Sequence, residues 1–140
     1  MACDHAGYLL KEVVKKHLQE NGFEVDDCGT WSEESVDYPD FAHKVGKAVN
    51  NGEVERGIVI CGSGNGVQMT VNKYPNVRCA LCWCTEIARL ARQHNDANVL
   101  SLPARFIDQN TALDIVDCFI ANKFLANEER HVRRVAKIRP

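Results

Sequence analysis

The run from Gly57 to Cys61 is the feature that most restricts how this chain can fold. It is apolar without interruption, and a strand of that kind has to be covered on both faces, as the strands of a parallel sheet are. The next five residues, 62–66, contain three glycines and lead directly into a segment with helical spacing. A buried strand followed by a glycine-rich turn and a helix predicts an α/β fold.

Strands and helices alternate along the rest of the chain. Apolar residues recur at helical spacing between Tyr8 and Glu20, and Asn21-Gly22 is typical of a helix end. Helices are expected at about 8–20, 40–50, 67–73, 85–93, 109–123 and from 128, and strands at 1–3, 23–28, 57–61, 77–84 and 98–102. This order predicts a three-layer αβα sandwich, Rossmann-like, with a five-stranded parallel sheet whose first strand is shortened. Residues 1–140 are expected to form one domain, because neither a linker nor a repeat interrupts them.

The charge balance argues against two classes of partner. The 17 basic and 19 acidic residues give a net charge of −2, so the chain has no general attraction for nucleic acid or for an anionic membrane. No apolar run reaches the roughly 20 residues that span a bilayer, and the first residues do not resemble a signal peptide. We therefore expect a cytoplasmic protein that holds any anionic ligand through local groups.

The seven cysteines do not indicate a disulfide framework, because their number is odd and they are spread over a chain long enough to bury a core. Most have apolar neighbours and are expected to be small buried side chains. Cys79, Cys82 and Cys84 are spaced like metal ligands, but side chains alternate between the faces of a strand and these three cannot all converge. We therefore expect no metal site at these three cysteines.

The glycine-rich turn is the strongest indication of a ligand. Gly62, Gly64 and Gly66 allow successive N–H groups to point at an anion in front of a helix. The spacing is neither that of a dinucleotide-binding loop nor that of a P-loop, and Val67 stands where a phosphatase loop would carry arginine. A helix amino terminus favours the reactive thiolate. Cys61 is therefore a candidate base or nucleophile, although a purely structural turn is an alternative.

Three further places carry side chains suited to chemistry. His5 follows Asp4 after the short first strand, and His94 lies near a helix end, but a surface loop and a polar helix end explain these histidines as well. Arg130 and Arg134 belong to a charged segment that is also typical of a solvated helix face.

Several short segments, in this order and spacing, resemble the type B ribose-5-phosphate isomerase family over essentially the whole chain. They are Cys3-Asp4-His5-Ala6-Gly7, Gly29-Thr30-Trp31, Val36-Asp37-Tyr38-Pro39, Ile60-Cys61-Gly62-Ser63-Gly64-Asn65-Gly66, Asn72-Lys73, Arg78-Cys79-Ala80, Arg92-Gln93-His94-Asn95-Asp96-Ala97-Asn98 and Arg130-His131. The family also contains galactose-6-phosphate and allose-6-phosphate isomerases. The resemblance implies an aldose–ketose isomerase that works through a cis-enediolate without metal or cofactor.

The resemblance also implies roles for individual residues. Cys61 matches the proton-transfer base, Ser63 a nearby hydroxyl, and His94 the residue that opens the sugar ring. The remaining matched positions contact the substrate: Asn95 beside His94, Asp4, His5 and Tyr38 at the sugar, Gly62, Gly64, Asn65 and Gly66 at the enediolate, and Arg105, Arg130 and Arg134 at the phosphate.

Other functions remain open at this point. The residues do not distinguish ribose 5-phosphate from a hexose 6-phosphate such as that of allose or galactose. A sugar-phosphate-binding protein without activity would use the same glycine turn, and a thiol redox protein would use two neighbouring cysteines. Neither of the last two explains the Asp4-His5 and His94-Asn95 segments.

The strand order predicts that the active site is shared between subunits. Cys61 ends a strand, whereas His94 precedes one, so within one chain they belong to opposite edges of the sheet. Both can act on one substrate only if His94 comes from a neighbouring subunit. We therefore expect a homodimer, or a tetramer, with active sites at the subunit interface and with the helix from about 128 packing on the partner.

Overall fold

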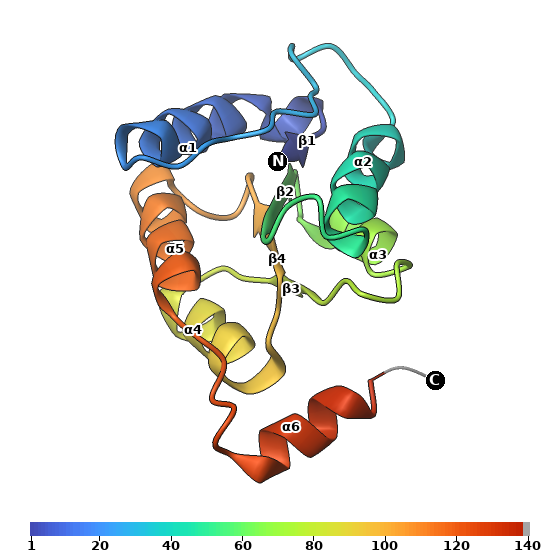
Figure 1. Ribbon diagram of the computed structural model, residues 1–140. Coiled ribbons are helices and arrows are strands. Elements are labelled where there is room, and N and C mark those ends of the chain that lie inside the picture. Colours follow the sequence, from blue (N-terminus) through green and yellow to red (C-terminus); the bar gives the residue numbers. More distant parts are fainter. Residues whose placement is uncertain (139–140) are drawn as a thin grey trace.

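The computed structural model describes residues 1–138 and has a layered α/β architecture (Figure 1). Four parallel strands form one sheet in the order β1 (Ala2–Cys3), β2 (Gly57–Cys61), β4 (Val99–Pro103) and β3 (Cys79–Leu81). Every residue of the two central strands, β2 and β4, is buried. The uninterrupted apolar run is therefore covered on both faces, as expected for a parallel sheet.

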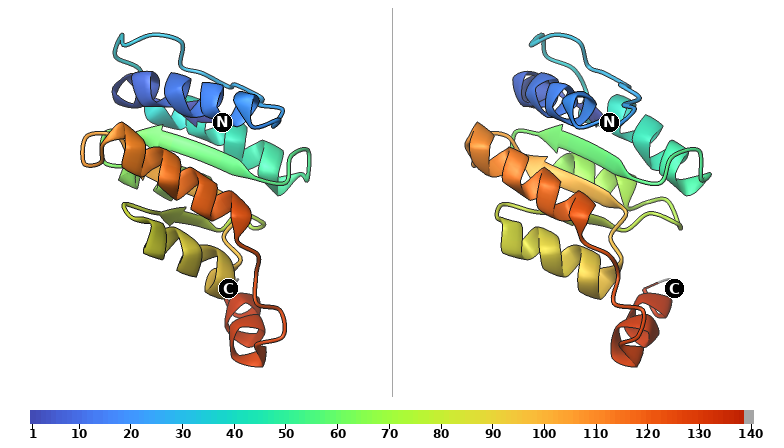
Figure 2. Two further views of the ribbon diagram at one scale, coloured as in Figure 1. Left: turned by 90° about the vertical axis from the view of Figure 1, so that its left-hand side faces the viewer. Right: turned by 60° about the vertical axis from the view of Figure 1, so that its left-hand side comes forward.

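Helices cover both faces of this sheet (Figures 1 and 2). On one side lie α1 (Tyr8–Glu20), α4 (Thr85–Asn95) and α5 (Gln109–Ala121), and on the other lie α2 (Tyr38–Asn50) and α3 (Asn65–Val71). Alternate β2 residues serve the two cores, because Ile58 and Ile60 pack with the first group while Val59 and Cys61 pack with the second. The expected αβα sandwich is confirmed. Within residues 1–138, no helix has the length and apolar character needed to cross a membrane.

A last helix, α6 (Glu129–Ala136), stands apart from both helix layers, near the C-terminal end of α4 (Figure 2). A short 3-10 helix, His5–Gly7, connects β1 to α1. The boundaries of α1 are those expected. The strand expected at 77–84 extends only over Cys79–Leu81. The residues before it do not join the sheet, because the Val77 N–H donates to Tyr74 O in a turn and the Arg78 N–H donates to the side chain of Asn98.

The expectation of a fifth strand at 23–28 is wrong. The chain there runs beside β1 and makes irregular backbone bonds, with Cys28 N donating to Met1 O and Cys3 N donating to Gly29 O. Gly29 has a left-handed φ of 93°, at which the chain leaves the extended conformation of a regular strand. β1 itself has two residues, so the expected shortening of the first strand is confirmed.

A buried ion pair holds this irregular segment to α1. Lys11 is fully buried and its Nζ lies 2.6 Å from both carboxylate oxygens of Asp27. Lys15 donates to the same carboxylate at 2.8 Å, and Gly29 N donates to it at 3.0 Å. Burial raises the pKa of Asp27, but the hydrogen bonds from Lys11, Lys15 and Gly29 outweigh this effect and lower it to about 2.

Replacing Asp27 with Asn should lower the free energy of unfolding by about 3 kcal/mol, because the buried Lys11 charge then keeps only Glu12, at 3.0 Å, as a counterion. The wild-type carboxylate has its pKa depressed on folding, from 3.8 to about 2. Its contribution is therefore present above about pH 4 and is lost as the pH falls toward 2. Urea unfolding at several pH values measures both effects.

The matched control is Glu20→Gln, which removes the exposed Lys16–Glu20 pair at 3.8 Å. Such a pair contributes less than about 1 kcal/mol. Equal losses in the two variants would contradict the special role of the buried pair.

Candidate active site

The glycine-rich turn joins the end of β2 to the start of α3. Gly64 has a left-handed φ of 74° and directly precedes the first helical residue, Asn65. Its N–H donates to the sulfur of Cys61 at 3.1 Å, and Asn65 N donates to Ser63 Oγ at 3.3 Å. The turn therefore brings one backbone donor, the Gly64 N–H, to the buried Cys61 thiol and sets further N–H groups at the start of α3.

Two neighbouring strands hold the turn in this conformation. Ser101 in β4 is fully buried and its hydroxyl donates to Gly64 O at 2.7 Å. A side chain at Gly64 would collide with Leu81 at the end of β3. The sequence reasoning assigned no role to Ser101, although a single polar residue inside an apolar strand was a signal that could have identified it.

Asp4 lies at the same edge of the sheet as Cys61. Cys3 pairs with Ile60 in the sheet, and Asp4 N donates to Ile60 O at 3.1 Å, so Asp4 emerges next to the end of β2. Its carboxylate accepts a hydrogen bond from Gly7 N at 3.0 Å. His5 follows, and its Nδ1 accepts from Val36 N at 3.4 Å, which connects it to the segment before α2.

Tyr38 and Arg105 also border the turn. The ring of Tyr38 lies against Gly66, where an added Cβ would be 2.6 Å from Tyr38 Cζ. Arg105 lies over Gly62, where a Cβ would be 3.2 Å from Arg105 Cδ, and its N–H donates to Gly62 O at 3.0 Å. The predicted residues of β1, β2, α2 and the β4–α5 connection thus gather at the carboxyl edge of the sheet.

His94 and Asn95 do not join this group. They end α4, which comes just before β4. In the sheet, Val99 at the start of β4 pairs with Gly57 at the start of β2, whereas Cys61 pairs with Pro103 at the other end of both strands. A five-residue strand spans on the order of 17 Å. The left view of Figure 2 shows the β2 arrow pointing away from the side on which α6 lies.

The end of α4 is firmly anchored. Asp96 ends the helix in the left-handed conformation, and its carboxylate accepts from Arg78 at 2.8 Å and from Arg92 at 3.0 Å. Arg92 is buried and also donates to Asn122 O. Arg130 and Arg134 are exposed on α6, which packs against α4.

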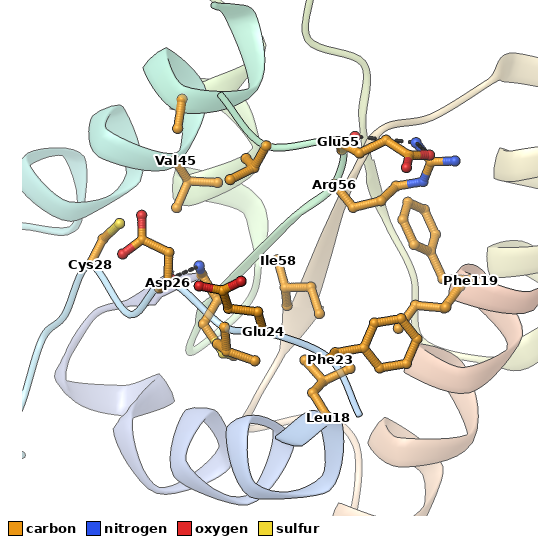
Figure 3. Close-up of a pocket in the computed structure, with 15 residues that line it drawn as sticks. Leu18, Phe23, Glu24, Asp26, Cys28, Val45, Glu55, Arg56, Ile58 and Phe119 are labelled. Atoms are coloured by element: carbon orange, nitrogen blue, oxygen red, sulfur yellow. Dashed lines mark hydrogen bonds and ion pairs between the residues drawn. The ribbon is translucent and has the colours of Figure 1, made fainter. Parts of the chain in front are cut away.

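A cavity of about 350 Å³ lies elsewhere, beside the irregular segment (Figure 3). Leu18, Phe23, Ile58 and Phe119 give it apolar walls, and Arg56 is among the charged residues that line it. No predicted site residue contributes to its wall. This cavity is therefore separate from the candidate active site.

Most of the other thiols are unsuited to acid–base chemistry. All seven cysteines are unpaired. Burial raises the pKa of Cys3 and Cys82 to about 12, and it raises the pKa of Cys28, Cys79 and Cys118 as well. Among residues 1–138, no group of three His, Cys, Asp or Glu side chains is arranged to hold a metal ion.

Known proteins resemble this chain over nearly its full length. A family model described as Ribose/Galactose Isomerase matches residues 1–138. Ribose-5-phosphate isomerase B of Escherichia coli (strain K12) is 43% identical over 136 residues, which cover 97% of this chain and 90% of that protein. The structure of Clostridium thermocellum ribose-5-phosphate isomerase B has a TM-score of 0.95 and 48% identity, covering 98% of this chain and 91% of that one.

A second solved structure was determined with a ligand. Ribose-5-phosphate isomerase B of Mycoplasma genitalium with bound ribulose-5-phosphate has a TM-score of 0.92 and 42% identity, and the match covers 98% of this chain and 90% of that one. These matches extend over nearly the whole chain. The chain belongs to the ribose/galactose isomerase family.

Proposed function

We propose that this chain is an aldose–ketose isomerase that interconverts ribose 5-phosphate and ribulose 5-phosphate through a cis-enediolate. The observation that carries the proposal is the Cys61 thiol beside a turn of backbone amides, with Gly64 N donating to its sulfur at 3.1 Å. The name of the Escherichia coli relative and the ribulose-5-phosphate bound in the Mycoplasma genitalium structure support this choice of substrate.

Cys61 is the proton-transfer base in this mechanism. Its thiolate takes the proton from C2 of the open-chain aldose, the C–H electron pair forms the C1–C2 double bond, and the aldehyde oxygen becomes negatively charged. The Ser63 hydroxyl carries a proton from O2 to O1, and Cys61 then returns its proton to C1 as O2 becomes the ketone oxygen. Cys61 and Ser63 end the reaction as they began it, and the net change only relocates hydrogen and electrons within the substrate. The step therefore needs neither a metal ion nor a redox cofactor.

The amides of Gly62, Gly64, Asn65 and Gly66 stabilise the enediolate. Each preorganised donor of this kind contributes roughly 3 kcal/mol to the transition state when water is excluded. These donors are fixed before the substrate arrives, because Ser101 and Leu81 hold the turn. The thiol therefore supplies the base for the proton transfer, and the turn supplies the groups that stabilise the enediolate.

Other residues hold and open the sugar phosphate. Asp4, His5 and Tyr38 contact the sugar, and His94, with Asn95 beside it, moves the proton that opens the furanose ring. The phosphate is bound by arginines. Arg130 and Arg134 are four residues apart on α6 and so lie on one side of that helix, and Arg105 approaches from the opposite edge.

The active form is a homodimer, or a tetramer built from two such dimers, because no single chain brings His94 to Cys61. A two-fold axis that sets the amino edge of one sheet against the carboxyl edge of the other gives two equivalent sites. In this arrangement α6 packs on the partner subunit. Val132 on α6 and Ile138, two residues beyond its end, are exposed in the single chain and are available for such a contact.

A hexose 6-phosphate is the second candidate substrate, because the matching family model is described by both ribose and galactose. A coupled assay of the purified protein with the 5-phosphate of ribose and the 6-phosphates of allose and galactose separates these alternatives. Ribose 5-phosphate should be converted with the highest kcat/KM. Binding of all three without turnover would instead identify a sugar-phosphate-binding protein.

Replacing Cys61 with Ala should lower kcat by about a thousandfold or more, since the transferring base is lost. KM and the midpoint of thermal unfolding should change little, because the backbone amides of the turn are retained. Cys84→Ala is the matched control and should keep wild-type turnover, since Cys84 lies outside the site. Turnover close to wild type in Cys61→Ala would show that this assignment is wrong.

Mixing inactive Cys61→Ala with inactive His94→Ala protein should restore activity once subunits exchange. Each mixed dimer then contains one site with both residues intact, so about one quarter of the wild-type activity is expected at full exchange. In the control, Cys61→Ala is mixed with the Cys61→Ala/His94→Ala double variant and recovers nothing. A fully active monomer, or no recovery after exchange has been demonstrated by mass spectrometry, would exclude the shared site.

A further inference from the structure

His94 does not stand alone at the end of α4. The imidazole of His131, in the first turn of α6, lies parallel to it, with ring centroids 4.1 Å apart and an angle of 16° between the planes. His131 is only 4% exposed, whereas His94 is partly exposed. One face of the His94 ring is therefore covered by a second ring from an element that follows it by more than thirty residues.

The backbone fixes His131 in this place. The chain leaving α5 is tied to the last turn of α4, because Gln93 Nε2 donates to Asn122 Oδ1 at 2.8 Å and Leu125 N donates to Gln93 O at 3.0 Å. His131 N then donates to Glu128 O at 2.9 Å as α6 begins. The two rings thus belong to elements whose relative position is already set.

His131 meets His94 with its ring face and not with a hydrogen bond. Its Nε2 is buried and has no hydrogen-bond partner among the described residues. Burial lowers the pKa of His131, and the nearby positive groups His94, Arg130 and Arg134 lower it further, against a smaller opposing effect of Glu128. His131 is therefore neutral near pH 7 and offers a flat, uncharged surface on which the His94 ring can rest.

Several other charged groups near the pair have partners of their own. On α4, Glu86 is bound by Arg89 at 2.5 Å, and Arg92 is bound to Asp96. On α6, Glu128 lies 3.8 Å from Arg130. The His94 imidazole, by contrast, lies against the ring of His131.

We propose that His131 is a positioning residue for His94, and that its stacked ring holds the His94 imidazole in the plane required to open the sugar ring. The inference rests on the proposed function, because it gives His94 the ring-opening role. An unstacked histidine at a helix end would sample several rotamers, and loss of a productive orientation costs rate even when every reacting group is present.

The test separates ring opening from proton transfer. Ribulose 5-phosphate is open-chain, because its 5-hydroxyl carries the phosphate, so exchange of its C1 proton with D2O needs Cys61 and the glycine turn but no ring opening. Conversion of ribose 5-phosphate needs both. His131→Leu should lower kcat for ribose 5-phosphate by about tenfold or more with little change in KM, and should leave C1 exchange within about twofold of wild type.

A matched variant isolates the flat ring. His131→Phe is also neutral and apolar but keeps a ring to stack on, so its turnover should lie within about threefold of wild type. Glu129→Gln, at an exposed position in the same first turn and outside the proposed site, controls for general disturbance of α6. Three outcomes would overturn the proposal: equal losses in the Phe and Leu variants, equal slowing of isomerisation and exchange, or a rise in KM alone, which indicates a ligand contact.

A second measurement does not depend on activity. In wild-type protein the His131 ring should shift the carbon-bound ring protons of His94 upfield, and this NMR shift should vanish in His131→Leu and persist in His131→Phe. Unchanged His94 signals in a folded His131→Leu variant would contradict the stacking role. If wild-type protein converts no sugar phosphate, the proposed function fails, and the NMR comparison still decides whether His131 positions His94.

Discussion

The pairing of β2 with β4 determines where every candidate group lies. Five residue pairs, from Gly57–Val99 to Cys61–Pro103, align the two strands in the same direction. Segments that follow these strands, including the glycine turn and Arg105, therefore come out at one edge. Residues that precede β4, including His94, stay at the other edge. Because both strands are fully buried, a shift of their register would move apolar side chains out of both cores, so the separation is fixed.

The conformation of the glycine turn depends on its neighbours as much as on its own sequence. Gly64 can adopt a left-handed φ without strain, but a glycine allows many other conformations too. The hydroxyl of Ser101 and the side chain of Leu81 select this one, and Tyr38 packs on Gly66 from a third direction. The hydrogen bond from Gly64 N to Cys61 is therefore a result of tertiary packing, which makes the amides ready for a developing negative charge.

Local sequence patterns predict much of the fold. They fail where residues far apart in the sequence determine the conformation of a segment. The spacing in α1 and the glycine turn after β2 were read correctly, because each lies within one short segment. The segment at 23–28 has the composition of a strand, yet the ion pair between Lys11 and Asp27 and the φ of Gly29 direct it elsewhere. The stack of His131 on His94 was also beyond local reasoning, since thirty-seven residues separate the rings.

Under the proposed function, the single chain contains two halves of a site, and these lie at opposite edges of the sheet. One half is the thiol with its amides, held by the sheet, and the other is His94 with α6, held by the buried Arg92 and by its bonds to Asp96 and Asn122. Neither half needs a lid or a hinge to reach its own geometry. Under the proposed sharing of the site, the accuracy with which acid and base face one substrate is then set by the subunit interface alone. For this reason α6, which carries both His131 and the arginines proposed to bind the phosphate, has to be fixed to α4 before the partner arrives.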